Sequence, residues 1–270
     1  MRTNPVRTRR TRLRTALVAV MALVAASALA ACASDDKSGS GNGSGESGTL
    51  NVLAAASLTE VFTDLAKDFE KDHPGVKVKL AFDSSATLAE QVNQGAPADV
   101  LATADTDTMQ TVVDQDGTDG DPKVFATNDL VMAVPPGNKA GITSIGDLDK
   151  PGVKYVVCVD TAPCGKLAVK VLAASGVKTK PASEEVDVKA TLSKVELDEA
   201  DAGLVYASDI LSAGKKVGKV DLPTNNENLN TYPIAALSSA RKPTLAKDWV
   251  DLVTSAKGQQ ALADAGFGKP

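Results

Sequence analysis

Hydroxyl side chains gather at two short segments of the chain, each directly before an apolar pattern typical of a helix. Ser57 follows three alanines at residues 54–56, and Ser85 lies in the hydroxyl-rich run at residues 83–87. The first amides of a helix have no partner within the helix, so they are available as donors beside these hydroxyls. Free amides and hydroxyls together suit the binding of an anion.

Three further junctions between a predicted strand and a predicted helix have the same character. They are A-P-C-G at residues 162–165, D-V-K at residues 187–189 and V-Y-A-S-D at residues 205–209. In open α/β sheets, ligands bind outside the carboxyl ends of the strands, where the helices begin. The sequence therefore predicts a ligand site bordered by these junctions.

Each junction also has a purely structural interpretation, and the residues alone leave both open. Ser57 and Glu60 have the spacing of a capping box, in which the serine only caps a helix. The run at residues 83–87 can be a serine-rich turn. A single tyrosine at a strand end, such as Tyr206, is more often a packing residue than a ligand.

Short apolar runs alternate with amphipathic segments along most of the chain, which is the pattern of a mostly parallel α/β sheet. The predicted strands are residues 50–54, 76–82, 99–102, 130–134, 155–159, 202–206 and 232–237. The predicted helices are residues 58–69, 88–94, 166–174, 188–195, 208–213, 245–254 and 258–265.

The first 31 residues are typical of a lipoprotein signal peptide. They carry six arginines and no acidic residue, and the apolar run at residues 16–31 ends in L-A-A before Cys32. Such a run is too short to span a bilayer, so we expect cleavage that leaves Cys32 as the lipid-modified first residue. A retained membrane anchor is the alternative.

Residues 32–48 are rich in Ser and Gly and are predicted to be a flexible linker. The protein is then exported and lipid-anchored to the outer face of the cytoplasmic membrane.

Charge excludes several classes of partner. Loss of the six arginines leaves 23 basic and 34 acidic residues, a net charge of −11. A chain this acidic is a poor partner for nucleic acid or anionic lipid. Aromatic residues make up 3% of the chain, which disfavours a site that stacks bases or sugars.

Two cysteines remain for the exported chain, Cys158 and Cys164, and in an oxidising compartment we expect them to pair. A metal site is the alternative, but His73 is the single histidine and lies far from both. A hydrolase needs a nucleophile with a base, and the sequence has no G-x-S-x-G elbow. We therefore expect no enzyme and no catalytic residues. A surface adhesin remains a rival class.

The chain resembles the periplasmic molybdate-binding proteins of bacterial ABC importers over nearly all of residues 50–267. The resemblance rests on an ordered series of short motifs rather than on one of them. They are A-A-A-S-L-T at 54–59, F-x-S-S-x-T-L-A at 82–89, G-A-P-A-D-V at 95–100, A-D at 104–105, P-C-G at 163–165, G-L-V-Y-A-S-D at 203–209, Y-P-I-A at 232–235 and G-Q-Q-A-L-A-D-A-G-F at 258–267.

The resemblance implies an oxyanion held by hydroxyls and amides, with no cofactor and no direct ligand to a metal cation. Ser57 and Ser85 would each supply a hydroxyl and an amide, Tyr206 a hydroxyl, and Cys164 and Val188 their amides. The ligand would be molybdate or tungstate, and another tetrahedral oxyanion such as sulfate is the alternative. The chain departs from the family at Cys164, where a small residue such as Ala is usual. A Cys158–Cys164 disulfide would stiffen that rim of the site.

Two lysines lie beside the amide donors implied by the resemblance. Lys166 and Lys189 could add positive charge to the site. Because both stand at predicted helix starts, we expect them to point to solvent.

The resemblance also implies a two-lobed, type II periplasmic-binding-protein fold of the α/β class. Lobe I would comprise residues 49–131 and 233–270, and lobe II residues 132–232. Two strands, near 130–134 and 232–237, would cross between the lobes as hinges. The partners would be molybdate and an ABC permease with its ATPase, and the protein would act as a monomer.

Overall fold

A computed structural model describes residues 47–223 and 228–270. The predicted signal peptide, Cys32 and nearly all of the predicted linker lie outside these described residues. None of the helices within the described ranges is long and apolar enough to cross a membrane. The first strand begins at Gly48, one residue before the predicted start of lobe I.

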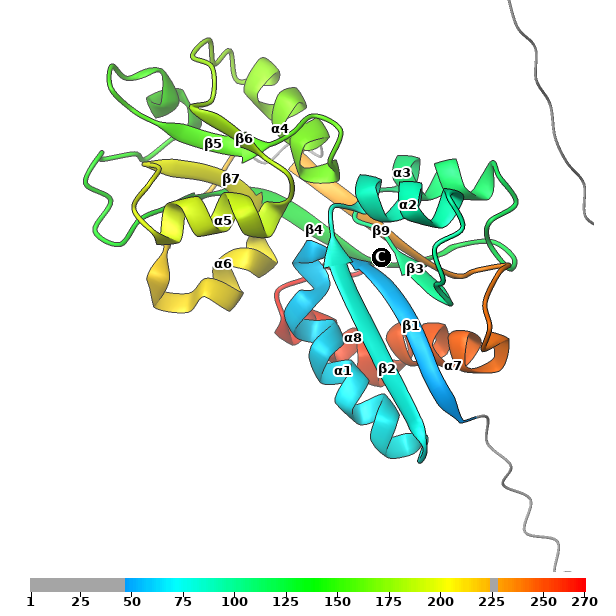
Figure 1. Ribbon diagram of the computed structural model, residues 1–270. Coiled ribbons are helices and arrows are strands. Elements are labelled where there is room, and N and C mark those ends of the chain that lie inside the picture. Colours follow the sequence, from blue (N-terminus) through cyan, green and yellow to red (C-terminus); the bar gives the residue numbers. More distant parts are fainter. Residues whose placement is uncertain (1–46, 224–227) are drawn as a thin grey trace, which may run out of the picture. The chain divides into compact units, whose positions relative to one another are not determined.

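Strands and helices alternate through the described part of the chain (Figure 1). The strands are β1 (Gly48–Ala55), β2 (Val76–Asp83), β3 (Val100–Ala102), β4 (Lys123–Val134), β5 (Tyr155–Cys158), β6 (Ser183–Glu185), β7 (Ala202–Tyr206), β8 (Gly218–Val220) and β9 (Leu229–Ala236). The α-helices are α1 (Thr59–Asp72), α2 (Ser85–Asn93), α3 (Thr106–Val113), α4 (Pro163–Ala174), α5 (Val188–Glu196), α6 (Ala207–Ala213), α7 (Pro243–Thr254) and α8 (Ala256–Asp264). Short 3-10 turns at Ala56–Leu58, Ile145–Asp149 and Gly214–Lys216 complete the described elements.

The sheet is mixed, so the prediction of a mostly parallel sheet is wrong. The strand order is β2-β1-β3-β9-β4-β7-β5-β6, with β8 beside β4. Strand β1 is parallel to β2 and β3, and β5 is parallel to β6 and β7. All pairings of β4 and β9 are antiparallel. These two strands run in opposite directions through the middle of the sheet. The hydrophobic periodicity of the sequence cannot predict strand direction.

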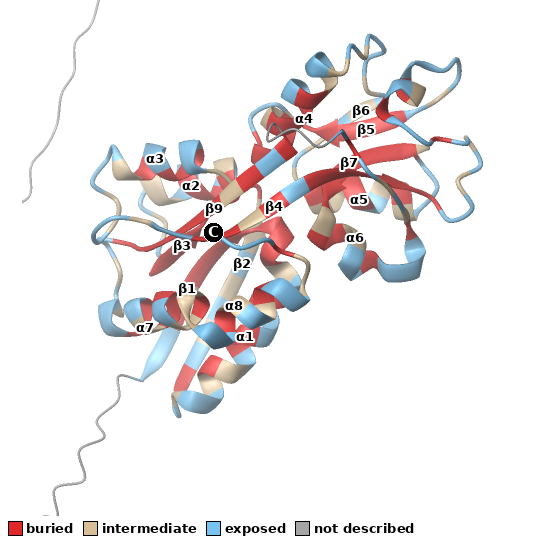
Figure 2. Cartoon of the chain, turned by 180° about the vertical axis from the view of Figure 1, so that it is seen from behind, coloured by how far each residue is buried: buried red, intermediate tan, exposed pale blue. Residues whose placement is uncertain are grey.

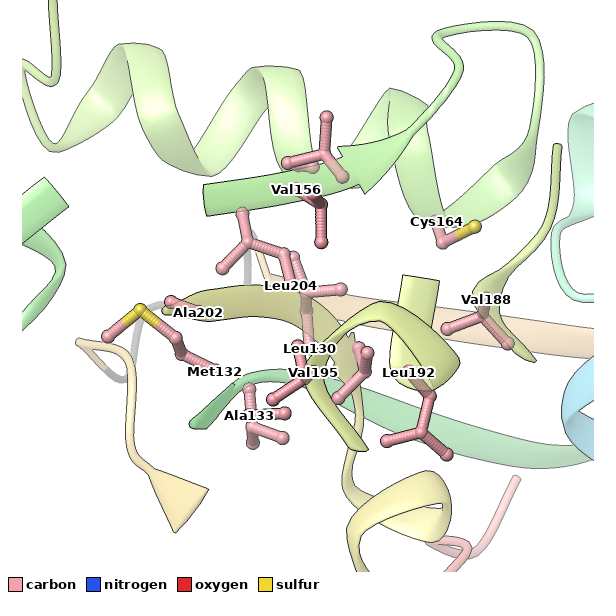
Figure 3. Packing of buried hydrophobic residues seen from close by; sticks show 14 of the residues in the cluster. Leu130, Met132, Ala133, Val156, Cys164, Val188, Leu192, Val195, Ala202 and Leu204 are labelled. Carbon is pink, nitrogen blue, oxygen red and sulfur yellow. The ribbon is translucent and has the colours of Figure 1, made fainter. Parts of the chain in front are cut away.

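Buried residues line the strands and one face of most helices (Figure 2). Their apolar side chains form separate cores along the sheet. One, which we call the 130–222 core, contains residues 130–222 together with Ala56, and several of its side chains appear in Figure 3. The other two, which we call the terminal cores, are built from residues 50–126 and 232–267. Helices α1, α7 and α8 supply one terminal core, while α2 and α3 supply the other.

Strand β4 passes from the terminal cores to the 130–222 core. Its residues 123–129 pair with β9, and its residues 130–133 pair with β7. The sequence predicts only residues 130–134 of this strand, because Thr127, Asn128 and Asp129 interrupt the apolar run. Asn128 is nevertheless buried, with its amide hydrogen-bonded to Ser208 and Tyr232.

Three short elements, α3, β6 and β8, are absent from the sequence prediction. Helix α3 has the sequence T-D-T-M-Q-T-V-V, in which three threonines and two valines lower helix propensity. Its start is fixed by Asp105, whose carboxylate accepts a hydrogen bond from the Thr108 amide. The three-residue strands β6 and β8 are too short for a periodic signal.

Candidate anion-binding site

A small cavity lies where the 3-10 turn at Ala56–Leu58 and helices α2, α4 and α5 begin, next to the last residues of strands β1, β2 and β7. Its empty volume is about 220 Å³. Pockets for drug-sized organic ligands usually measure about 300–1,000 Å³, so this cavity suits a small ion better. It is lined by Ala55, Ala56, Ser57, Asp83, Ser84, Ser85, Ala104, Pro163, Cys164, Asp187, Val188 and Tyr206.

All five residues predicted to contact the ligand line this one cavity: Ser57, Ser85, Cys164, Val188 and Tyr206. They come from five segments that span 150 residues of sequence. Ser57 and Ser85 belong to segments of the terminal cores, and the other three belong to the 130–222 core. Figure 3 shows Cys164 and Val188 at the edge of that core.

Ser57 does not cap a helix, so the capping-box interpretation is wrong. Helix α1 begins two residues later, with Leu58 at the N-cap position and no side-chain cap. The Ser57 hydroxyl instead lies 2.9 Å from the Tyr232 hydroxyl, and both are buried. Glu60, the other half of the predicted box, pairs with Lys189. Tyr232 on strand β9, 175 residues away in the sequence, therefore holds the Ser57 side chain at the cavity wall.

Ser85 is also held by a group distant in sequence rather than by a turn. Its Oγ accepts a hydrogen bond of 2.9 Å from the Ala104 amide, and the serine is 1% exposed. Helix α2 begins at Ser85, and Ser84 at the N-cap makes no side-chain cap bond. The first amides of α2 are left free of capping side chains beside the cavity.

Tyr206 ends strand β7 with its ring fully buried, so packing is part of its role, as the structural interpretation holds. Its hydroxyl also accepts a hydrogen bond of 2.6 Å from Nδ2 of Asn230. Burial raises the pKa of Tyr206 well above its ordinary value. The phenol therefore stays protonated at neutral pH and can donate to a ligand in the cavity.

The predicted disulfide between Cys158 and Cys164 is confirmed, with the two Cα atoms 5.8 Å apart. Helix α4 starts at Pro163, so its first turn packs directly on the end of β5. A Cβ atom at Gly165 would lie 1.9 Å from the Val159 carbonyl oxygen, so only glycine fits there. The disulfide and this close approach together fix the position of the Cys164 amide.

Val188 is the first residue of α5. The preceding residue, Asp187, is the N-cap, and its carboxylate accepts from the Ala190 amide rather than from the Val188 amide. The macrodipole of α5 favours negative charge at this end. The described side chains that line the cavity include two carboxylates, Asp83 and Asp187, and no Lys or Arg. Binding of an anion here must therefore rest on amide and hydroxyl dipoles.

Lys166 and Lys189 do not point to solvent, so that prediction is wrong. Lys166 Nζ lies 3.1 Å from Oδ2 of Asp105, which belongs to the opposite side of the cavity. Lys189 Nζ lies 2.9 Å from both carboxylate oxygens of Glu60 and 3.2 Å from Oδ1 of Asp209. The lysines start helices, as expected, but acids on neighbouring elements draw their long side chains inward.

The pKa values of Lys189 and Asp209 are both shifted. Burial works to lower the pKa of Lys189, but Asp209 and Glu60 outweigh it, so the pKa is raised. Burial raises the pKa of Asp209, although Lys189 and the Tyr206 amide work against this shift. Asp209 is fully buried, so its negative charge depends on Lys189 for compensation.

The sequence prediction missed the residues that hold the hydroxyls from behind: Ala104, Asn128, Asn230 and Tyr232. Asn128 and Asn230 lie opposite each other on the paired strands β4 and β9, and both are buried. Polar side chains inside otherwise apolar strands are the signal that could have found them, because a buried amide needs partners.

Metal binding, the alternative for the cysteines, gains no support. No group of three or more His, Cys, Asp or Glu that could hold a metal occurs within residues 47–223 and 228–270. Both cysteines are committed to the disulfide. His73, at the end of α1, stacks on Phe69 with 4.0 Å between ring centroids and lies near Asp248.

Comparison with known proteins agrees with this geometry. The model of the bacterial extracellular solute-binding protein family matches residues 50–268. The molybdate-binding protein of Mycobacterium tuberculosis is 43% identical over 219 residues, which cover 81% of this chain and 84% of that protein.

Two solved structures share the fold. The periplasmic molybdate-binding protein of Azotobacter vinelandii has a TM-score of 0.73 and 21% identity, over 82% of this chain and 99% of that one. The sulfate-binding protein of Mycobacterium tuberculosis has a TM-score of 0.69 and 18% identity, over 81% of this chain and 86% of that one. The predicted periplasmic-binding-protein fold is confirmed, and the chain belongs to the family of bacterial extracellular solute-binding proteins.

Proposed function

We propose that this protein is the extracytoplasmic solute-binding component of an ABC importer, and that its ligand is molybdate, with tungstate as a close substitute. One observation carries the proposal: four residues with hydroxyl groups and the starts of four helices line a cavity of about 220 Å³, and its lining among the described residues includes no Lys or Arg. The 43% identical relative is named a molybdate-binding protein, which supports this choice among oxyanions.

In this proposal Ser57 and Ser85 each donate through a hydroxyl and an amide, Tyr206 through its hydroxyl, and Cys164 and Val188 through amides. Hydrogen bonds to a charged group contribute about 1.5–3 kcal/mol each, so seven contribute roughly 10–20 kcal/mol before costs. Ordering of the protein and ligand offsets part of this sum. The remainder is compatible with micromolar to nanomolar affinity.

We also propose that residues 49–131 with 233–270 form one lobe, and that residues 132–232 form the other. The separation of the 130–222 core from the terminal cores supports this division. Ligand residues would then come from both lobes, so the bound oxyanion would favour their closure. The closed form is the state that a permease with its ATPase would recognise, and lipid on Cys32 would keep the monomer at the membrane. No catalysis is part of this role.

The test is calorimetric titration of the purified protein with molybdate, tungstate, sulfate and phosphate in parallel. The proposal expects tight one-to-one binding of molybdate and tungstate, because hydroxyls and helix starts line a cavity of small-ion size and the 43% identical relative is named a molybdate-binding protein. Sulfate binding of equal strength would assign the protein to a different oxyanion importer. Absence of heat with all four ions would reject an oxyanion function.

A further inference from the structure

We propose that Asn230 is a positioning residue that fixes the Tyr206 hydroxyl as a donor toward the bound oxyanion. This inference rests on the proposed function, because it requires an oxyanion in the cavity. Asn230 is not among the residues that line the cavity, so it would act through Tyr206 and not by contact with the ligand.

The direction of one hydrogen bond carries the inference. Asn230 Nδ2 donates to the Tyr206 hydroxyl oxygen over 2.6 Å. A phenol has one proton to donate, and it accepts through its oxygen lone pairs. Because Asn230 donates to this oxygen, the phenolic proton is directed away from Asn230, toward the cavity that Tyr206 lines and the neighbouring Tyr232 hydroxyl. A bound oxyanion is the stronger acceptor of the two. Asn230 is 8% exposed, so water competes little for this bond.

The hydroxyls of Ser57 and Ser85 are also hydrogen-bonded to protein groups. The Ala104 amide donates to Ser85 Oγ over 2.9 Å. Asn128 Nδ2 lies 3.4 Å from the Tyr232 hydroxyl, and that hydroxyl lies 2.9 Å from Ser57 Oγ. Either hydroxyl can be the donor in the Ser57–Tyr232 bond. With Asn128 as donor to Tyr232, the Tyr232 proton can go to Ser57, and the Ser57 proton is then free for a ligand.

In this arrangement the hydroxyls of Ser57, Ser85 and Tyr206 each have a proton that can be donated to the cavity, and this suits a ligand that only accepts hydrogen bonds. A hydrogen phosphate ion carries a proton of its own, which would meet another donor at Tyr206. Asp83 and Asp187 also line the cavity, but each has one carboxylate oxygen occupied by a nearby backbone amide. Tyr206 accepts its hydrogen bond from a side-chain amide, that of Asn230. A single substitution of Asn230 by a residue of the same shape can therefore reverse the direction of this bond.

The experiment replaces Asn230 with Asp, which has the same shape. In N230D, an ionised carboxylate can only accept, so the Tyr206 proton turns away from the cavity. A protonated carboxyl can donate as the amide does. Position 230 is buried, and burial raises the pKa of a carboxyl, so we expect the introduced carboxyl to be protonated at about pH 5.5 and the molybdate affinity of N230D to be near wild type there. It should fall about 10- to 100-fold as the carboxyl ionises toward pH 9, as for loss of one hydrogen bond to a charged group.

Charge repulsion is separated from hydrogen-bond direction by two controls. Tyr206 also faces Tyr232, Asp209 and Asp105, and these groups are shared with the wild type, whose pH profile is the reference. In a Y206F background, N230D should cost less than about threefold, because no phenol remains to be turned. N228D places a carboxylate on the same buried segment, where Asn228 contacts the Leu130 carbonyl, and should not reproduce the pH profile.

Each result has a defined meaning. If the wild type binds no oxyanion, the proposed function fails. If the wild type binds molybdate and N230D shows the same affinity at every pH, or loses as much in the Y206F background, this inference alone is overturned. If N230D does not fold, Asn230→Leu tests the same point. That variant should narrow the preference for molybdate over phosphate, and an unchanged preference would reject the role.

Discussion

Lys189 on α5 and Glu60 on α1 form an ion pair in which both carboxylate oxygens lie 2.9 Å from the ammonium nitrogen. Helix α1 belongs to a terminal core and α5 to the 130–222 core, so the pair joins the two sides of the cavity. The same ammonium lies 3.2 Å from Oδ1 of the buried Asp209. Lys189 thus pairs with the exposed Glu60 and with the buried Asp209.

Replacing Lys189 with Met should destabilise the protein far more than replacing Glu60 with Gln. In K189M the charge of Asp209 stays buried without compensation, which costs about 3–5 kcal/mol in the free energy of unfolding. Glu60 has a half-exposed side chain, and loss of such a surface partner costs about 0–1 kcal/mol. Chemical denaturation of the two variants and the wild type measures the difference.

The deficit of K189M should also depend on pH. Burial raises the pKa of Asp209 in the folded chain, so folding favours its protonated form, and this contribution is lost as pH rises through the folded pKa. Without Lys189 that pKa rises further. K189M should therefore lie closer to wild type at about pH 4.5 than at about pH 8. An equal deficit at both values would contradict the account.

The sequence predicts the five cavity residues but not the groups that support them. Ser57, Ser85 and Tyr206 stand at strand ends, where an α/β pattern concentrates ligands, and a family resemblance selects them. Their partners Ala104, Asn230 and Tyr232 lie 19, 24 and 175 residues away. Contacts over such separations depend on strand order, and the antiparallel placement of β9 between β3 and β4 follows from no local pattern.

The same distinction explains the failed capping prediction. The S-x-x-E spacing at Ser57 and Glu60 is a real local signal, but stronger partners win both side chains. Tyr232 takes the serine hydroxyl in a buried bond, and Lys189 takes the carboxylate. Helix α1 then begins without a side-chain cap. The local capping rule fails here because tertiary partners hold both side chains.

Removal of the Ser57 or Ser85 hydroxyl should weaken molybdate binding by about 10- to 100-fold, because each variant loses a hydrogen bond to a charged ligand. Stability should fall by only about 1–3 kcal/mol, the cost of leaving the Tyr232 hydroxyl or Ala104 amide unpaired. Titration calorimetry and thermal melts of S57A and S85A measure both effects. T59A is the matched control, because its hydroxyl bonds to the Ala56 carbonyl and does not line the cavity. Melting without loss of affinity would support a structural role instead.

Reduction of the Cys158–Cys164 disulfide should loosen the first turn of α4 and so weaken binding through the Cys164 amide. The closed loop is short, so the stabilisation lost is about 2 kcal/mol in the chain-entropy account. We expect a several-fold, roughly 3- to 10-fold, loss of molybdate affinity, because the amide must be ordered again on binding. Affinity is measured with and without reductant. The double variant C158A/C164A should match the reduced protein and ignore reductant, whereas equal affinity in all samples would show that Gly165 packing alone holds the amide.

Ionisation of Tyr206 should not change the molybdate affinity between about pH 7 and about pH 10. A phenolate could not donate and would repel the anion, so ionisation of Tyr206 would abolish its contribution. Burial raises the pKa of Tyr206 well above the ordinary value of 10.0, so the donor form persists through this range. The pKa of Lys189 is raised as well, which keeps the neighbouring ion pairs intact below about pH 10. Y206F should bind about 10- to 100-fold more weakly than wild type, again with a flat profile. A wild-type affinity that falls tenfold by about pH 9, while Y206F stays flat, would mean that Tyr206 ionises early and that its burial does not protect the donor.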